Sequence, residues 1–138
     1  MSNTLQITPF MHVRDLGAAI AFLERVLGFE TVVRMPEYAY LEREGAGLRV
    51  MERPDAMVFP ADCGRFAYYI DVRDVDSIHE ALKAKLDALP EGHVHGPADK
   101  PYGQRELIVR VPDNQLLVFG AEIASQDAGG GSTSAARI

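Results

Sequence analysis

The chain has 138 residues, 47% of them hydrophobic, and a formal net charge of −6. This length suits one globular domain with its own core, and the acidic charge without a basic cluster argues against a nucleic-acid partner. The first residues do not resemble a signal peptide, and no apolar run is long enough to span a bilayer. We therefore expect a cytoplasmic protein with no membrane partner.

The first half of the chain predicts a strand, a helix and three further strands. Residues 5–13 alternate between an apolar and a more polar face, and Asp15 follows where a helix N-cap belongs. A stripe at helical spacing comes next, and Gly28 ends the helix. The stripe consists of Leu16, Ile20, Leu23 and Leu27. The further strands are predicted at 30–34, 38–44 and 48–52, with a hairpin turn at 44–47.

The second half repeats this pattern after a proline-containing connector. Val13-Arg14-Asp15 recurs as Val72-Arg73-Asp74, each time between an alternating strand and a helical stripe. Three more strands are predicted in "HVHG", "RELIVRV" and "QLLVFG". The sequence thus predicts two βαβββ modules, at about 5–53 and 64–121. The segment 124–138 has no apolar pattern and is predicted to be a flexible tail.

Three stretches together resemble the vicinal oxygen chelate superfamily of glyoxalases, bleomycin resistance proteins and dioxygenases. They are "ITPFMHVRDLGAAIAFLERVLGFE", "FAYYIDVRDVDSIHEAL" and "PADKPYGQRELIVRVPDNQLLVFG". The first and third are most similar to the bleomycin-resistance branch. The resemblance implies a single α+β domain over 1–123, in which two βαβββ modules form curled mixed sheets around a cleft with helices on the outer faces. It also implies a homodimer.

The strand faces fit this scheme. The apolar faces would pack under the helices: Ile7, Met11 and Val13; Phe66, Tyr68, Ile70 and Val72; Leu107, Val109 and Val111. The opposite faces would line the cleft: Thr8, Phe10 and His12; Ala67, Tyr69 and Asp71; Glu106, Ile108 and Arg110. Arg105 and Glu106 should face opposite sides of their strand, and a buried Glu106 would need a partner such as Arg49 or a cationic ligand.

The candidate ligand-binding residues are Phe10, His12, Tyr38, Arg49, Tyr69, Tyr102 and Glu106. Flat aromatic groups beside a few charges suit a planar, polar or cationic small molecule. The resemblance further implies that each cleft of the dimer combines residues of both chains. We expect the dimer to bury more than roughly 1,000 Å² and not to need the tail.

The usual metal-ligand positions of the superfamily correspond to Thr8, Ala67 and Val118. These residues cannot make that site, so we expect no metal, no other cofactor and no catalytic residue. The first hypothesis is a metal-free protein that binds an antibiotic-like small molecule and acts by sequestration. A second is a lyase or dioxygenase with displaced ligands, for which His12, Asp71 and Glu106 could hold Zn, Ni, Mn or Fe. A third is a structural or regulatory dimer without a small ligand.

Overall fold

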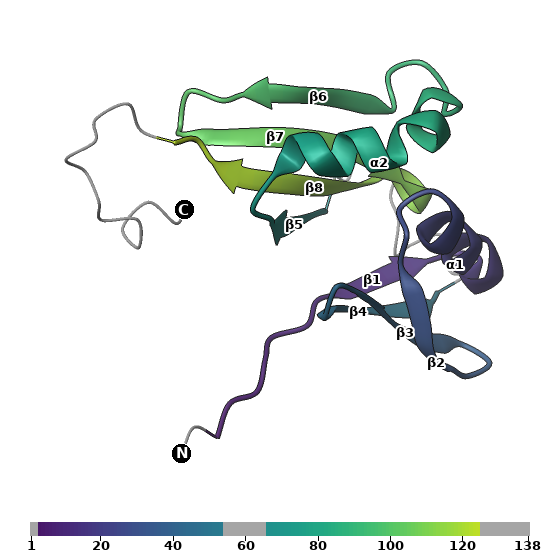
Figure 1. Ribbon diagram of the computed structural model, residues 1–138. Helices are drawn as coiled ribbons and strands as arrows, with labels where there is room; N and C mark the ends of the chain where they lie inside the picture. The colour runs from purple at the N-terminus through teal and green to yellow at the C-terminus, as the bar shows by residue number, and fades with distance from the viewer. Residues whose placement is uncertain (1–2, 54–65, 125–138) are drawn as a thin grey trace. The chain divides into compact units, whose positions relative to one another are not determined.

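The computed structural model describes residues 3–53 and 66–124, which fall into two compact units (Figure 1). The first unit is Met1–Phe66 with Val111–Gln115, and the second is Ala67–Arg110 with Leu116–Ile138. The predicted connector, including Cys63, and the predicted tail beyond Ala124 lie outside the described residues.

The first unit has the predicted βαβββ order. It contains β1 (Phe10–Val13), α1 (Leu16–Arg25), β2 (Glu30–Arg34), β3 (Tyr38–Arg43) and β4 (Ala46–Glu52). The sheet order is β1-β4-β3-β2, with β1 parallel to β4 and the other pairs antiparallel. The predicted turn is a two-residue hairpin loop, because Arg43 pairs with Ala46 and both Glu44 and Gly45 adopt positive φ.

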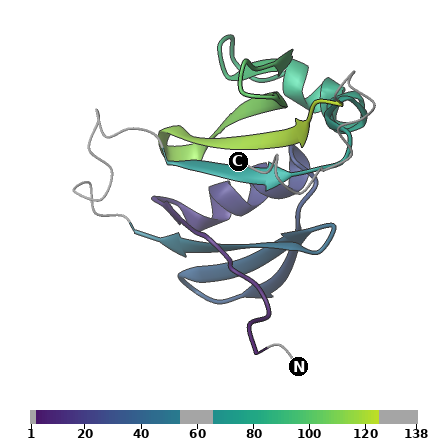
Figure 2. The same cartoon turned by 90° about the vertical axis from the view of Figure 1, so that its left-hand side faces the viewer.

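Helix α1 forms where capping and apolar spacing coincide. The Asp15 carboxylate accepts a hydrogen bond from the Ala18 amide at 3.0 Å, which satisfies one of the free amides of the first turn. The four predicted stripe residues are all buried against the sheet. Figure 2 shows α1 against one face of this sheet, so the other face is left for polar and aromatic side chains.

The second unit repeats the arrangement. It contains β5 (Ala67–Asp71), α2 (Val75–Asp87), β6 (Val94–Asp99), β7 (Gln104–Val111) and β8 (Gln115–Glu122), with a short 3-10 turn at Pro112–Asn114. The sheet order is β5-β8-β7-β6, with β5 parallel to β8 and β6 antiparallel to β7. The predicted fold class, α+β with two βαβββ modules and mixed sheets, is confirmed.

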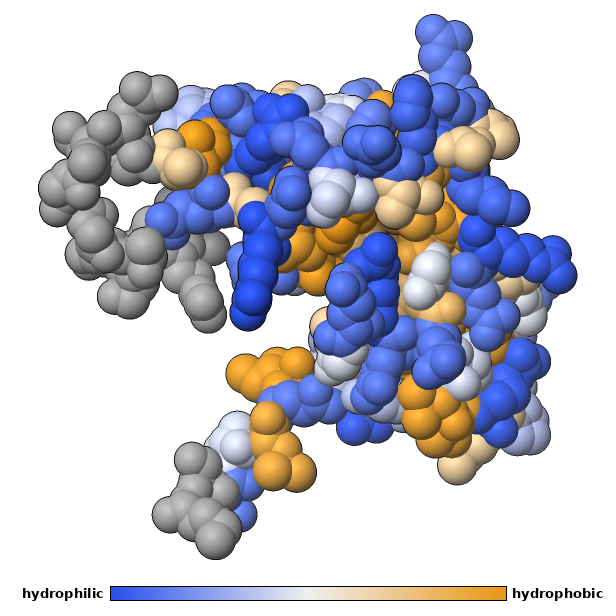
Figure 3. Space-filling model, in the orientation of Figure 1, coloured by the Kyte–Doolittle hydropathy of each residue, from blue (hydrophilic) through white to orange (hydrophobic). Residues whose placement is uncertain are grey.

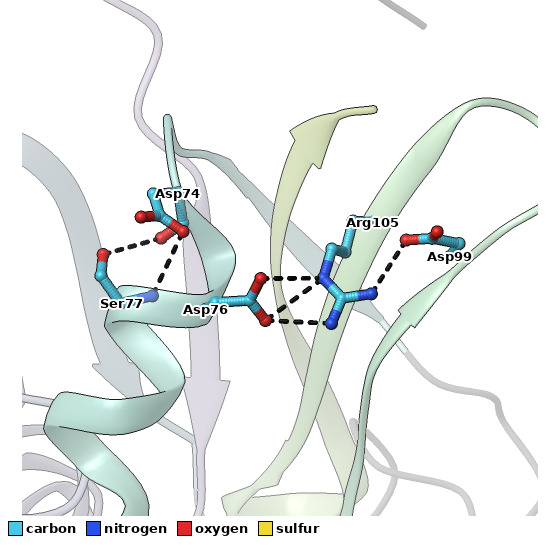
Figure 4. A network of polar contacts seen from close by, with 5 residues as sticks. All are labelled: Asp74, Asp76, Ser77, Asp99 and Arg105. Carbon is cyan, nitrogen blue, oxygen red and sulfur yellow. Dashed lines mark hydrogen bonds and ion pairs between the residues drawn. The ribbon is translucent and has the colours of Figure 1, made fainter. Parts of the chain in front are cut away.

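Polar contacts at the start of α2 tie the helix to its sheet (Figure 4). Asp74 caps the helix by accepting from the Ser77 amide at 3.3 Å. Arg105 donates to both carboxylate oxygens of Asp76, from 3.0 to 3.2 Å, and to Asp99 at 2.9 Å. Arg105 therefore points to the helix side of β7, and the prediction that it and Glu106 face opposite ways is confirmed.

The segment Val111–Gln115 packs with the first unit. The Gln115 side-chain amide donates to the His12 carbonyl at 2.8 Å, and the Asp113 carboxylate accepts from the Arg14 amide at 2.9 Å. These bonds hold the strand-to-helix corner between β1 and α1.

Five residues predicted to face the helices are not buried. Ile7 is 92% exposed and Phe66 is 58% exposed, and Tyr68, Ile70 and Val72 are partly exposed. Met11, Val13, Leu107, Val109 and Val111 are buried as predicted. Ile7 precedes β1 and Phe66 precedes β5, so both strands are shorter at their start than predicted. Alternation indicates the side of a strand on which a residue lies, but not whether a helix covers that point.

Candidate functional site

Each sheet has one face against its helix and one face that carries aromatic and charged side chains. The predicted binding residues form two groups, one in each unit. Phe10, His12, Tyr38 and Arg49 gather on the first sheet, and Tyr69, Tyr102 and Glu106 gather in the second unit. Each group is described within its own unit.

Arg49 is the centre of the first group. Its neighbours in the sheet are Phe10 on β1 and Tyr40 on β3. Its Nε donates to the Thr8 hydroxyl at 2.8 Å and its Nη1 donates to the Tyr38 hydroxyl at 2.7 Å. The guanidinium carbon lies 5.4 Å from the centre of the Tyr40 ring, a distance suited to a cation–π interaction. Three contacts therefore fix this half-buried cation.

Aromatic rings border Arg49 on the β1 side. The Phe10 ring centre lies 6.2 Å from that of His12 and 6.5 Å from that of Tyr38. Phe10 is 46% exposed. The His12 Nδ1 atom is buried and has no hydrogen-bond partner within residues 3–53 and 66–124.

Tyr40, which is not among the predicted binding residues, adds polar atoms to this face. Its hydroxyl accepts from the Gln6 side chain and donates to Glu42, both at 3.0 Å. Tyr38, two residues before it on β3, is the predicted binding residue of this strand. In the structure both belong to this face, and Tyr40 contacts Arg49 by its ring and Tyr38 contacts Arg49 by its hydroxyl.

Glu106 is the centre of the second group. It is only 4% exposed, whereas Tyr69 is 42% exposed and Tyr102 is 50% exposed. Burial, a hydrogen bond to Glu106 and the negative charge of Glu106 raise the pKa of the Tyr69 hydroxyl. The hydrogen bond to Glu106 is the main cause that raises the pKa of Tyr102. The described partners of the buried carboxylate are two tyrosine hydroxyls, and the pairing with Arg49 expected from the sequence stays a prediction.

Gln104 is a member of this group that the sequence analysis missed. It is 6% exposed, and its Oε1 lies 3.3 Å from the Tyr69 hydroxyl. A phenol has one proton, and the charged Glu106 is the stronger acceptor for it. Gln104 precedes Glu106 by two residues on β7. Because side chains alternate along a strand, both lie on the same face.

Register explains the position of the Tyr69 ring. Tyr69 pairs with Val118 and Asp71 pairs with Gly120 in the parallel β5–β8 ladder. The Tyr69 side chain lies across Gly120, where a Cβ atom would collide with its hydroxyl and ring. A glycine at this position therefore lets the ring reach toward Glu106.

The residues at the usual metal-ligand positions do not fit a divalent cation. Thr8 accepts from the Arg49 guanidinium, and Ala67 and Val118 have no side-chain donor atom. In the repeat, Phe10 corresponds to Tyr69, and their partners Arg49 and Val118 correspond as well. The described residues contain no group of three His, Cys, Asp or Glu side chains able to hold a metal. The alternative set His12, Asp71 and Glu106 stays a prediction, since its members divide between the two units.

No helix in the described part of the chain is long and apolar enough to cross a membrane.

Comparison with known proteins places these features in a family context. The model of the Glyoxalase/Bleomycin resistance protein/Dioxygenase superfamily matches residues 6–119. No curated protein matches the chain.

Solved structures with the same fold include binding proteins and an enzyme. A bleomycin-binding protein in complex with bleomycin has 25% identity and a TM-score of 0.71, over 86% of this chain and 99% of that one. The bleomycin-binding protein of Streptomyces verticillus with copper(II)-bleomycin has 24% identity and a TM-score of 0.70, over 91% and 100% of the two chains. Lactoylglutathione lyase from Agrobacterium tumefaciens has 22% identity and a TM-score of 0.62, over 87% and 96%.

Proposed function

The chain belongs to the glyoxalase/bleomycin resistance protein/dioxygenase superfamily, and from this premise we propose that it binds an antibiotic-like small molecule and sequesters it without chemical change. The likeness to a bleomycin-binding protein at 25% identity supports the proposal. The ligand would carry a planar or cationic group.

The arrangement around Glu106 is the observation that carries the proposal. A carboxylate that is 4% exposed lies beside two tyrosines that each expose about half of their surface. The tyrosine rings offer faces for stacking or for a cation–π contact, and the charge of Glu106 favours a cationic group between them. Such a group would compensate a negative charge whose present partners are neutral hydroxyls.

Thermal unfolding in the presence of bleomycin tests the proposal. A ligand at 100 times its dissociation constant stabilises the folded protein by roughly 2.7 kcal/mol, which raises the midpoint of unfolding. Glu106→Gln should weaken binding about tenfold or more, because it removes the charge that the cation meets. Glu122→Gln, at the exposed end of β8, removes the same charge and should bind like the parent. Mass spectrometry should recover the ligand unchanged.

Failure of binding across a broad panel of cationic and planar drugs would refute sequestration and favour a structural or regulatory role. Elemental analysis addresses the enzymatic alternative. Because threonine, alanine and valine occupy the usual ligand positions, we expect no stoichiometric metal after dialysis. Near-stoichiometric Ni, Zn, Mn or Fe would instead support a lyase or dioxygenase with displaced ligands.

The binding form would be a homodimer whose clefts combine residues of two chains. The segment before β1 supports this proposal, since Leu5 is 93% exposed and Ile7 is 92% exposed. Figure 3 shows hydrophobic side chains on the segment that leads to the N-terminus. Strand β1 is also an edge of its sheet. Exposed apolar side chains next to a free edge favour pairing with another chain.

A further inference from the structure

We infer that the polar face of the first sheet is a binding site for a carboxylate group, with Arg49 as its anion-binding residue. The ligand class is an organic acid with a flat apolar body. The inference rests on the proposed function, because it takes this face of the first unit to belong to a protein that binds small molecules.

Arg49 has charge and donor capacity that its own neighbours do not use. A guanidinium has five N–H donors, and the described contacts of Arg49 use one on Nε and one on Nη1. Both acceptors are neutral hydroxyl oxygens. Within the described residues of the first unit no carboxylate lies in an ion pair with Arg49, and Glu42, an acid of the same face, accepts from Tyr40. The half-buried positive charge therefore lacks an anionic partner among the described residues of its own unit.

Two other half-buried arginines of this protein do have carboxylate partners. Arg43 pairs with Glu44 at 2.6 Å, and Arg105 pairs with Asp76 and Asp99 at 3.0 and 2.9 Å. A charge that is partly removed from water and not paired is costly unless a ligand supplies the counter-charge. The contrast favours a binding role for Arg49 over a purely structural one.

The two hydroxyls beside Arg49 can also donate to an anion. The oxygens of Thr8 and Tyr38 accept from the guanidinium, so each keeps its own proton for another acceptor. The described contacts assign those two protons to no acceptor. Together with the N–H groups of Nη2, they make a set of donors around one cation, which is the arrangement that a carboxylate oxygen pair requires.

Aromatic surface next to these donors favours a flat apolar group on the rest of the ligand. Phe10 is 46% exposed, and its ring centre lies 6.5 Å from that of Tyr38 at an interplanar angle of 54°. A flat apolar body attached to the carboxylate would cover Phe10 while its charge reaches Arg49. An inorganic anion would gain only the second of these contacts.

The test is a titration of the full chain with benzoate and with benzamide, its neutral analogue of similar shape, at constant ionic strength. The NMR signal of the Arg49 Nε–H group reports binding directly. We expect benzoate to shift this signal in a saturable way and benzamide to bind about tenfold more weakly or not at all. Arg49→Gln should lose benzoate binding by about the same factor. Arg105→Gln removes the same charge from an ion-paired arginine and should bind benzoate like the parent.

Arg49→Lys keeps the positive charge and is a control for a loss of benzoate binding that results from misfolding. It should keep the parent's pattern of backbone amide signals and bind benzoate more weakly than the parent, because an ammonium lacks the planar fork. Equal binding of benzamide, or equal benzoate binding by Arg49→Gln, would overturn the inference. Bleomycin binding without benzoate binding would refute this site alone, whereas benzoate binding without any drug binding would refute the proposed sequestration of an antibiotic-like molecule alone.

Discussion

At the scale of single residues, Glu106 contributes to how two tyrosines titrate. Burial, a hydrogen bond to Glu106 and the charge of Glu106 raise the pKa of Tyr69, and the hydrogen bond to Glu106 is the main cause that raises the pKa of Tyr102. A folded-state pKa above the unfolded value of about 10 means that the folded chain binds more protons than the unfolded chain at alkaline pH. The stability that this contributes is fully present below about pH 10 and is lost as the pH rises through the folded-state pKa.

Glu106→Gln should therefore make two tyrosines ionise at lower pH than in the parent. The amide carries no charge, so it no longer disfavours the tyrosinate form. The stability lost as the pH rises above about 10 should also become smaller, since the folded and unfolded pKa values move closer together. Spectrophotometric titration of tyrosinate and urea unfolding at several pH values measure the two effects.

Tyr68 provides an internal reference for this experiment. Burial raises its pKa to about 12, and it lies on the other side of β5 from Tyr69. Its titration should be unchanged in Glu106→Gln. Identical titration curves for the variant and the parent would contradict the role assigned to Glu106, and Glu122→Gln serves as the charge-matched control.

At the scale of secondary structure elements, the two helices begin in the same way. Asp15 and Asp74 both adopt an extended backbone and accept from the amide three residues later, at 3.0 and 3.3 Å. Helix α1 has an additional acceptor, because Glu52 at the end of β4 accepts from the Leu16 amide at 2.9 Å. The first turn of α1 is therefore tied to its sheet as well as capped.

Removing either cap should destabilise the fold by a similar amount. Asp15→Ala and Asp74→Ala should each lower the free energy of unfolding by about 1 kcal/mol, because an amide of the first turn loses its acceptor. Asp15→Asn and Asp74→Asn keep an oxygen acceptor and should lie close to the parent. Urea unfolding measures all four. A loss of stability in the asparagine variants as large as in the alanine variants would show that the carboxylate charge matters more than the cap.

The caps and helical stripes were predictable because their signals are local. An aspartate before a stripe at helical spacing, or Glu44-Gly45 between two strands, specifies its own neighbourhood. The exposure of Ile7 and Phe66 was not predictable in this way, because it depends on where the helix cover ends. The site was predictable only in part for a related reason. The alternation of side chains along β7 predicted the face on which Glu106 lies. The contact of Arg49 with Thr8 was not predictable in this way, because it depends on contact between residues 41 positions apart in the chain.

At the scale of the whole molecule, the two modules have the same architecture and opposite chemistry. The open face of the first sheet centres on a cation, Arg49, and the group in the second unit centres on an anion, Glu106. Both central residues have neutral hydroxyl groups as partners. The two modules thus carry opposite charges among the described residues named here, while the capping aspartates and the buried helix-facing residues are of the same kind in both.

The proposed homodimer depends on the segment before β1. Leu5 and Ile7 expose nearly all of their apolar surface, and Ile7 continues the alternation that makes Met11 and Val13 core residues. An apolar segment at the free edge of a sheet can be buried by a second copy of the chain. Ile7→Lys should therefore weaken the dimer about tenfold or more, as removal of a buried interface anchor does. Val32→Lys is a matched control, since Val32 is 51% exposed on the opposite edge strand β2.

Sedimentation equilibrium of the parent, the two lysine variants and a chain that ends at Ile123 measures the assembly. We expect dimers for the parent, for Val32→Lys and for the shortened chain, and dissociation for Ile7→Lys at micromolar concentration. Ligand binding should be lost together with the dimer in Ile7→Lys if each cleft combines two chains. A monomeric parent would refute the dimer. A monomeric Ile7→Lys that binds its ligand as tightly as the parent would show that one chain is a complete binding unit, since a cross-subunit cleft cannot survive the loss of its partner.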